Sequence, residues 1–466
     1  MVDIHEQKTL DINTEPKDIV LVNNTKLDLV NNINNLFDGY LKEGVEKPFT
    51  TIHTFGKIPA KQLHIVNKKD LKDESKRQDI YKKIAALEGE VCVLIDTFEV
   101  EDYRTIVEEL SETILTANYS FDRFKTKDDD KAKDKNFHYY GETEIYENVL
   151  KGYVYGEMSN KCKDLVNTPY NYLNAVDLAN YAKELERYDG IQVTIYDKAQ
   201  IEAMNMGSYL GVNKGSKDEP RLIHIAYQGK KKFEKPVALV GKGVMYDTGG
   251  YSIKPSTGMP GMKVDMAGAA AVISALEAIA KLKLKANVIG IVAATDNRIG
   301  DDAIVPDDIL TAANGKTIEI VSTDAEGRLT LADAVWFAQQ QGAKKVIDVA
   351  TLTGSMVRSL GDQYTGAFTN DEGFLKEFQK VSEKTKEAIW HMPINKGYHK
   401  LLKSKVADIK NTGGPLAGAS TAAAFIENFI EDGTKWIHLD IAGTASTKNN
   451  EATGVMVKTF TELFYK

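Results

Sequence analysis

The sequence is poor in the features that mark secreted or membrane proteins. It has only two cysteines, Cys92 and Cys162, which can form neither a disulfide framework nor a zinc–thiolate cluster. No run of apolar residues approaches the roughly 18 needed to cross a bilayer. Residues 1–16 contain no basic stretch followed by an apolar one, so no secretory signal is readable. We therefore expect a cytoplasmic protein with no membrane association.

Several familiar catalytic motifs are also missing. The chain contains no HExxH, GxSxG, GxxxxGK[ST] or GxGxxG pattern. These absences weigh against the zincin, serine hydrolase, P-loop and dinucleotide-binding classes. The formal net charge is -8, and no basic stripe is visible. Because nucleic-acid binding depends on clustered positive charge, we expect no nucleic-acid partner.

Length and composition indicate two domains. A chain of 466 residues with 42% hydrophobic content is too long for one compact core. Apolar residues recur at helical spacing over residues 142–165, and such a helix could connect two domains. We place the boundary near residue 155, which predicts a smaller N-terminal domain over 1–155 and a catalytic domain over 156–466.

The pattern of elements predicts the α/β class in both domains. Strands are expected at residues 49–55, 62–66, 91–96, 192–196, 221–227, 237–240, 287–293, 318–321, 346–350 and 436–439. Helices are expected at residues 74–87, 102–116, 142–165, 265–280 and 329–341. Apolar strands between helices favour a central mixed, mostly parallel sheet flanked by helices. The charged run at 125–135 is typical of a solvent-exposed loop.

Charged residues are unusually dense in two apolar, glycine-rich segments. The segments at 237–272 and 321–335 carry Lys242, Asp247, Lys254, Lys263, Asp265, Asp324, Glu326 and Arg328. Glycines follow several of the expected strands, and ligands of open α/β sheets bind in the loops at those strand ends. Unpaired charge in such a buried setting is costly, so something must compensate it.

Each charged residue also has an ordinary structural explanation. Lys242 and Asp247 could form a salt bridge, and Asp265 could cap its helix. Taken together, however, four carboxylates in glycine-shaped loops are the hard oxygen ligands that a pair of divalent cations requires. The neighbouring lysines and arginine could neutralise these carboxylates instead, so charge counting does not decide. We favour a dinuclear metal site.

The spacing of Asp324 and Glu326 supports that interpretation. The two residues lie two apart, so in an extended segment both side chains would point to the same face. There they could bridge cations roughly 3.5 to 4 Å apart. Arg328 would continue the same face.

The segment at 322–329 reads STDAEGRL and resembles NTDAEGRL, the signature of the leucyl aminopeptidases, a cytosolic two-metal family. Further segments resemble the family in the same order, at 241–243, 247–250, 254–255, 262–267, 350–354, 407–414 and 438–443. The resemblance covers most of residues 160–466 and is loose before residue 150. Two departures are visible: Ser322 replaces an asparagine, and Tyr246-Asp247-Thr248 replaces the commoner Phe-Asp-Ser.

The resemblance implies a metalloaminopeptidase that hydrolyses the N-terminal peptide bond of short peptides. It assigns one metal ion to Lys242, Asp247, Asp265 and Glu326. It assigns the other ion to Asp247, Asp324 and Glu326. The two ions would be Zn²⁺ or Mn²⁺, with Mg²⁺ and Co²⁺ as alternatives. Lys254 and Arg328 would be the two catalytic side chains.

The implied mechanism uses a water that bridges the metal ions and ionises near neutral pH to give a hydroxide nucleophile. Lys242 must be an uncharged amine to act as a ligand. Lys254, in contrast, would stay charged and stabilise the oxyanion. The planar fork of Arg328 suits a carbonate-type anion, and the resemblance implies a bound bicarbonate there as the base.

The same resemblance implies a substrate pocket formed by Met262, Thr351 and Gly354. A methionine lining would favour N-terminal Leu and Met residues. Met262 could instead be an ordinary core methionine. His438, in an apolar strand, is interpreted as a core histidine rather than a ligand. The resemblance also implies a homohexamer, a dimer of trimers with active sites facing an interior cavity.

Two alternatives belong to other functional classes. Some members of the family associate with DNA, and salt-sensitive DNA binding would indicate that role here. A degenerate catalyst that keeps the fold as a scaffold is the other alternative. Loss of catalysis should be visible at the metal ligands, and every expected ligand is present.

Overall fold

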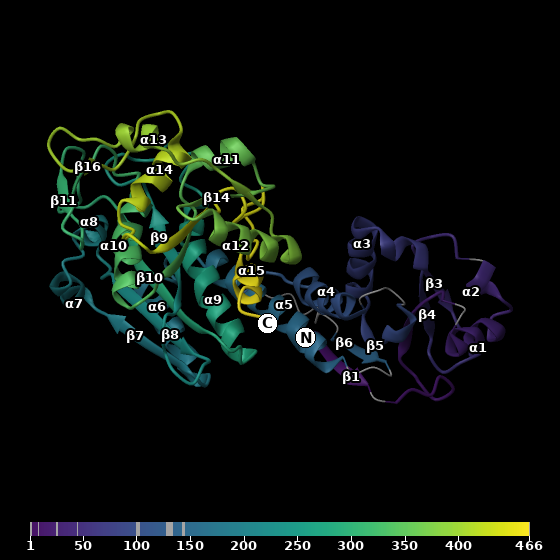
Figure 1. Cartoon of the computed structure of the whole chain (residues 1–466). Helices are drawn as coiled ribbons and strands as arrows, with labels where there is room; N and C mark the ends of the chain where they lie inside the picture. Colours follow the sequence, from purple (N-terminus) through teal and green to yellow (C-terminus); the bar gives the residue numbers. More distant parts are fainter. Residues whose placement is uncertain are drawn as a thin grey trace. The chain divides into compact units, whose positions relative to one another are not determined.

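The computed structural model describes residues 2–7, 9–24, 27–43, 45–98, 103–126, 134–141 and 145–465. The chain divides into two compact units, residues 1–160 and 161–466 (Figure 1). The division falls inside helix α5 (Tyr146–Asn167), the helix that also contains our expected boundary at residue 155. Most of the charged run at 125–135 lies outside the described residues.

The N-terminal unit is built on a six-stranded sheet with the order β1-β6-β5-β2-β4-β3. All neighbouring strands are parallel except β3 and β4. The strands are β1 (Val2–Gln7), β2 (Asp18–Val22), β3 (Phe49–His53), β4 (Gln62–Val66), β5 (Gly89–Leu94) and β6 (Lys135–Tyr140). The helices are α1 (Asp28–Leu36), α2 (Tyr40–Glu43), η1 (Lys68–Lys72), α3 (Glu74–Ala85), η2 (Ile95–Thr97) and α4 (Tyr103–Ala117).

Three strands of this sheet, β1, β2 and β6, were not predicted from the sequence. The central strand β2 shows why. Ile19 and Leu21 pack into one apolar cluster, and Val20 and Val22 pack into another on the opposite face. A strand buried on both faces has no alternation of polar and apolar residues, so its pattern does not distinguish it from other short apolar runs.

The second unit is built on an eight-stranded mixed sheet with the order β15-β14-β17-β13-β9-β10-β8-β7. Its middle four strands, β17, β13, β9 and β10, are parallel. These strands are β7 (Ile191–Tyr196), β8 (Arg221–Gln228), β9 (Val237–Asp247), β10 (Asn287–Asn297), β13 (Lys345–Ala350), β14 (Thr365–Thr369), β15 (Ile389–His391) and β17 (Lys435–Asp440). The structure thus confirms the predicted α/β class with a mixed sheet flanked by helices.

A small second sheet and the helices complete this unit. The small sheet contains β11 (Ile309–Thr311), β12 (Thr317–Glu319) and β16 (Ile409–Lys410). The helices are α6 (Ala175–Lys183), η3 (Glu184–Arg187), α7 (Lys198–Ala203), α8 (Gly207–Asn213), η4 (Met262–Met266), α9 (Ala267–Lys281), α10 (Gly327–Gln340), α11 (Gly354–Leu360), α12 (Glu372–Thr385), α13 (Lys396–Leu401), α14 (Gly418–Glu427) and α15 (Val457–Glu462).

Helices α9 and α10 cover opposite faces of strand β9, and glycines set the contact on each side. A Cβ on Gly241 would lie 2.6 Å from the Cα of Ala269 in α9. A Cβ on Gly327, the first residue of α10, would lie 2.3 Å from the Cε of Lys242. Because neighbouring strand residues face opposite sides, Gly241 faces α9 and Lys242 faces α10.

Our prediction that the strand ends at Val240 was wrong. Strand β9 continues to Asp247, so Lys242 lies within it rather than after it. Gly241 and Gly243 suggested a turn, since glycine often ends a strand. Their role here is close packing: a Cβ on Gly243 would lie 2.7 Å from Val292 of the neighbouring strand β10.

Gly268, the second residue of α9, lies where the helix packs most closely against the sheet. A Cβ on Gly268 would lie 2.1 Å from the carbonyl oxygen of Val349 and 2.9 Å from the amide nitrogen of Lys242. Backbone atoms cannot move aside as a flexible side chain can, so Gly268→Ala should destabilise the protein by more than about 2 kcal/mol. Chemical denaturation measures this loss.

Gly373→Ala is the matched control, because Gly373 is the second residue of α12 and its added Cβ would meet only the Asp371 carboxylate, at 3.3 Å. This change should shift the free energy of unfolding by less than about 0.5 kcal/mol. Equal effects of the two substitutions would contradict the packing argument.

Candidate active site

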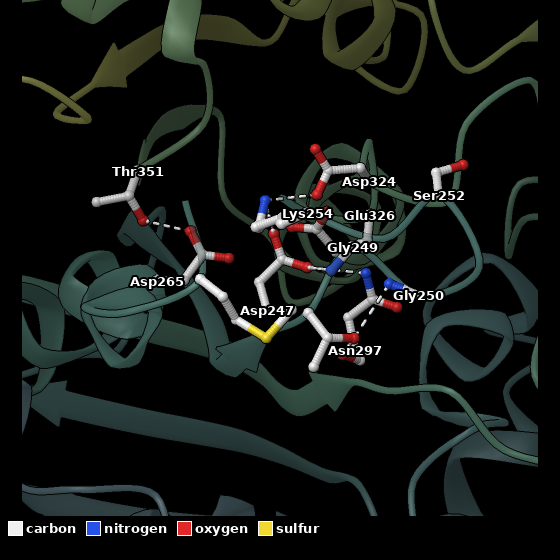
Figure 2. Close-up of polar contacts among 12 residues, drawn as sticks. Asp247, Gly249, Gly250, Ser252, Lys254, Asp265, Asn297, Asp324, Glu326 and Thr351 are labelled. Atoms are coloured by element: carbon white, nitrogen blue, oxygen red, sulfur yellow. Dashed lines mark hydrogen bonds and ion pairs between the residues drawn. The ribbon is translucent and has the colours of Figure 1, made fainter. Parts of the chain in front are cut away.

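Chemically active side chains gather at the carboxyl ends of the central parallel strands (Figure 2). Asp247 is the last residue of β9 and Asn297 is the last residue of β10. Thr351 directly follows β13. These ends share one edge of the sheet, where open α/β folds bind their ligands.

Two further segments bring acidic groups to the same edge. Asp265 lies in the short 3₁₀ helix η4, and α9 begins only at Ala267, so the helix predicted from residue 265 starts two residues late. Glu326 lies immediately before α10 in a helical backbone conformation. The prediction of an extended segment through Asp324 and Glu326 was therefore wrong; Asp324 lies in a turn that leads into the helix. Both carboxylates nevertheless lie in the same cluster (Figure 2).

Asp247, Asp265 and Glu326 form the centre of the cluster. Each offers a carboxylate oxygen, and the three oxygens lie within 4.8 Å of one another, a grouping that could hold a metal ion. All three side chains are buried. The Oδ2 atom of Asp265 is buried with no hydrogen-bond partner among the described residues. A buried carboxylate oxygen is not left unpaired without cost, so this atom fits a ligand for a cation.

Burial and the repulsion between neighbouring carboxylates shift the pKa values in the cluster. Burial, and then the neighbouring Glu326, raise the pKa of Asp247 to about 6. Burial also raises the pKa of Asp265 well above its usual range, although Lys242 opposes this. Two carboxylates at this separation resist ionising together, and a cation between them would remove the penalty.

Two lysines bind the carboxylates directly. The Nζ atom of Lys242 lies 2.7 Å from Asp265 and 2.9 Å from Glu326, and it also donates to the carbonyl oxygen of Thr351 at 3.0 Å. The Nζ atom of Lys254 lies 2.6 Å from Asp247 and also contacts Asp324. Burial lowers the pKa of each lysine, but the carboxylates outweigh it and hold both pKa values above the usual range.

The ion pairs do not balance the cluster. Four carboxylates and two ammonium groups leave two negative charges, which is the charge that one divalent cation neutralises. The sequence left open that nearby basic side chains neutralise the carboxylates. They do so only in part. Arg328, a further cationic side chain of these segments, donates from Nη1 to the carbonyl oxygen of Asn411 at 2.9 Å.

Arg328 is buried at the start of α10. Its Nε atom has no hydrogen-bond partner in the described part of the chain. Burial lowers its pKa to about 10, although Glu326, Asp440 and Asp324 oppose the change. A buried guanidinium with an unpaired donor is suited to bind an anion.

Asn297 was missed by the sequence reasoning, yet it connects two parts of the site. Its Nδ2 atom donates to Asp247 Oδ1 at 2.8 Å and to the carbonyl oxygen of Thr323 at 3.0 Å. Our predicted strand stopped at residue 293, whereas β10 runs to Asn297. The signal was present, because a polar residue at the end of an apolar parallel strand faces the ligand-binding edge.

Asn411 was also missed, and it holds the turn that carries Asp324. Its Oδ1 atom accepts from the amide nitrogen of Val321 at 2.8 Å, and its Nδ2 atom donates to the carbonyl oxygen of Ser322 at 2.7 Å. Thr323 is tied to the loop after β9 in a similar way, because its hydroxyl donates to the carbonyl oxygen of Gly249 at 2.6 Å. These contacts link segments that are distant in sequence.

The three residues predicted to bind substrate lie on two segments, η4 and the stretch between β13 and α11. Met262 begins η4 and is half-buried, three residues before Asp265. Thr351 lies against the cluster, because its hydroxyl donates to Asp265 Oδ1 at 2.9 Å. Gly354 is exposed at the start of α11. His438 is buried in β17, with its Nδ1 atom 2.5 Å from Asp348, outside this cluster.

The fold and the cluster together define a class of protein. A mixed α/β sheet that presents clustered carboxylates and lysines at the ends of its parallel strands is typical of metal-dependent hydrolases. No helix in the described part of the chain is long and apolar enough to cross a membrane.

Comparisons with known proteins narrow the class. Residues 160–461 match the cytosol aminopeptidase family, catalytic domain. The chain is 43% identical over 387 residues to a probable cytosol aminopeptidase of Bacillus subtilis (strain 168), a match covering 80% of this chain and 77% of that protein. A solved structure of a tomato leucine aminopeptidase mutant is similar with a TM-score of 0.85 and 28% identity, covering 100% of this chain and 96% of that one. The chain belongs to the cytosol aminopeptidase family and is an aminopeptidase, a hydrolase of peptide bonds.

The hydrogen bonds of Asn297 hold Asp247 and the Thr323 segment together, so Asn297 is predicted to position the active-site groups. Asn297→Ala removes both hydrogen bonds, which frees Asp247 and the Thr323 segment to move apart. We expect kcat for leucine p-nitroanilide to fall roughly tenfold or more, because small misplacements of active-site groups are costly. Asn395→Ala is the control, since the side-chain carbonyl of Asn395 caps α13 and accepts from no other described residue. Unchanged kcat in Asn297→Ala would count against the positioning role.

Proposed function

We propose that this aminopeptidase removes N-terminal residues from short peptides with two divalent cations held by its acidic cluster. The observation that carries the proposal is the convergence of four carboxylates on one sheet edge. With Lys242 uncharged as a ligand, the four carboxylates and the Lys254 ammonium group leave three negative charges, more than one divalent cation neutralises. The unpaired Oδ2 atom of Asp265 supports it further.

The proposed ligands follow the geometry and the family. Lys242, Asp247, Asp265 and Glu326 would hold one ion. Asp247, Asp324 and Glu326 would hold the other. The short distances from Lys242 to Asp265 and Glu326 support a shared position for these three groups. Lys242 would lose its proton on binding the ion, because a dication disfavours a neighbouring ammonium group. Zn²⁺ or Mn²⁺ suits this mixed oxygen and amine set, with Mg²⁺ and Co²⁺ as alternatives.

Divalent cations held by these residues would supply Lewis-acid chemistry, which lowers the pKa of a water so that it can serve as the nucleophile near neutral pH. Lys254 would act beside them as a charged donor. Its ammonium group is largely buried and is held by Asp247 and Asp324, so it is oriented before substrate binds. A positive charge fixed in such a cleft stabilises the negative charge that develops on the carbonyl oxygen.

Arg328 would hold an anion that accepts the proton of the attacking water, and bicarbonate is the proposed anion. The unpaired Nε atom and the burial of the guanidinium support a bound anion rather than a purely structural role. The planar fork matches the geometry of a carbonate oxygen pair. In this arrangement Arg328 positions the base and does not itself take the proton.

Selectivity for N-terminal residues would come from the free α-amine, which can reach a cation while a capped amine cannot. Met262, Thr351 and Gly354 would line the side-chain pocket, with Leu and Met preferred. The contact from Thr351 to Asp265 supports a pocket beside the cluster. Family membership further supports a cytoplasmic homohexamer acting on short peptides.

Metal analysis tests the ligand assignment. The purified parent should contain about two divalent ions per chain, as a two-metal mechanism requires. Asp324→Ala should lose a clear part of that metal and all measurable activity. Asp301→Ala, which removes an exposed carboxylate in the same unit, should change neither quantity. Full metal occupancy in the Asp324 variant would sink the assignment.

Lys254→Met separates catalysis from metal binding. The substitution keeps most of the length of the side chain but removes its charge, so kcat should fall roughly 100-fold or more. The metal content should stay close to that of the parent. Lys345→Met, at an exposed surface ion pair with Glu377, serves as the control and should retain full activity. If metal is lost in proportion to activity, Lys254 acts through the metal site and not on the substrate.

A further inference from the structure

A polar cavity separate from the acidic cluster lies beside the end of strand β10. Its volume is about 580 Å³, and its lining includes Tyr170, Asn171, Lys217, Asp218, Asp296 and Arg298. All of these residues belong to the second unit, and none is part of the acidic cluster described above. The volume is within the range of small-molecule sites.

Arg298 is held rigidly at this cavity. Its guanidinium carbon lies 4.2 Å from the ring centre of Tyr170 and 5.3 Å from that of Tyr246. Its Nε atom donates to Asp296 Oδ2 at 2.7 Å. Contacts with two aromatic rings and one ion pair fix the guanidinium, so little conformational entropy remains to be lost when a ligand binds.

The terminal amino groups of Arg298 are still available. They donate to no atom in the described part of the chain, and the side chain is 34% exposed at the cavity. Lys217 also lines the cavity, is exposed, and forms no ion pair with any residue that the structure describes. Two cationic groups therefore face one space with unused donors.

The acidic groups of the cavity already have donors. Asp296 is paired with Arg298, and Asp218 Oδ2 accepts from the hydroxyl of Tyr170 at 2.5 Å. Burial, and then the Asp218 hydrogen bond, raise the pKa of Tyr170, so its hydroxyl remains a donor. The groups still free to form hydrogen bonds are therefore the positively charged donors of Arg298 and Lys217. Such donors suit an anion.

We propose that this cavity binds a carboxylate group between the terminal amino groups of Arg298 and the ammonium group of Lys217. The two amino groups of a guanidinium form a planar fork that matches a carboxylate. The carboxylate could belong to a free organic acid or to the C-terminus of a short peptide. Arg298 directly follows Asn297, the last residue of β10, whose side chain donates a hydrogen bond to Asp247 of the acidic cluster.

Binding of N-acetylglycine to the full-length protein tests the cavity itself. This probe carries a carboxylate, and its capped amine prevents it from acting as a substrate. N-acetylglycinamide, which has the same shape without the charge, is the matched control. Saturation-transfer NMR or calorimetry should detect the acid and not the amide. Equal binding of the two probes would overturn the proposal.

Two variants assign the binding to the cavity. Arg298→Gln should weaken N-acetylglycine roughly tenfold or more, and Arg298→Lys should restore only part of it because the fork is lost. Lys217→Gln should weaken binding by a smaller factor. Because Lys217 is exposed, this variant still tests the site if the Arg298 variants fold poorly. Unchanged affinity in well-folded Arg298→Gln and Lys217→Gln would refute the site.

The source of the carboxylate is settled by comparing Leu-Gly with Leu-Gly-amide as substrates. If the cavity binds the C-terminus of the substrate, Arg298→Gln raises KM for Leu-Gly and leaves KM for Leu-Gly-amide unchanged. If it takes a free acid, the ratio of the two KM values stays the same while N-acetylglycine binding is lost. Either result supports the site. Neither depends on which residues bind metal, so a failure here is distinct from a failure of the proposed ligand set.

Discussion

Repulsion between carboxylates at one sheet edge is the constraint on which the rest of the second unit depends. Asp247, Asp265 and Glu326 are brought within a few ångströms of one another in a buried setting, where like charges are most costly. Lys242 and Lys254 offset part of that cost through direct ion pairs. The surrounding backbone must hold all five groups in place, because a cluster of this kind is stable only when its geometry is fixed.

Close packing of helices against the sheet provides that rigidity. Glycines at the contacts let α9 approach strand β9 from one face and α10 from the other. The same contacts bring Asp265, just before α9, and Glu326, just before α10, to the end of the strand. Asn297 and Asn411 then fasten the loops between these elements with side-chain hydrogen bonds to backbone atoms. Packing and polar contacts thus act on the same few residues.

Much of the site could be predicted from the sequence, since charged residues in apolar, glycine-rich segments are rare and their order resembled a known family. Glu326 and Asp247 were identified in this way, and both lie in the cluster. Asn411 could not be identified in this way, because it acts through hydrogen bonds to a segment about 90 residues away in the chain. Asn297 was overlooked for a different reason: it ends an apolar strand, but the predicted strand stopped at residue 293. The glycine at 241 was misread because the sequence does not show whether a missing Cβ serves a turn or a helix contact.

The enclosure of Lys242 affects how the active edge can move. Its side chain passes directly beneath Gly327, where even one added carbon would overlap it, and its strand lies between parallel neighbours on both sides. Such a group cannot swing out alone; exposing it requires separating α10 from the sheet. Slow exchange of the amide hydrogens around residue 242 would accordingly report the global opening of this unit rather than a local fluctuation.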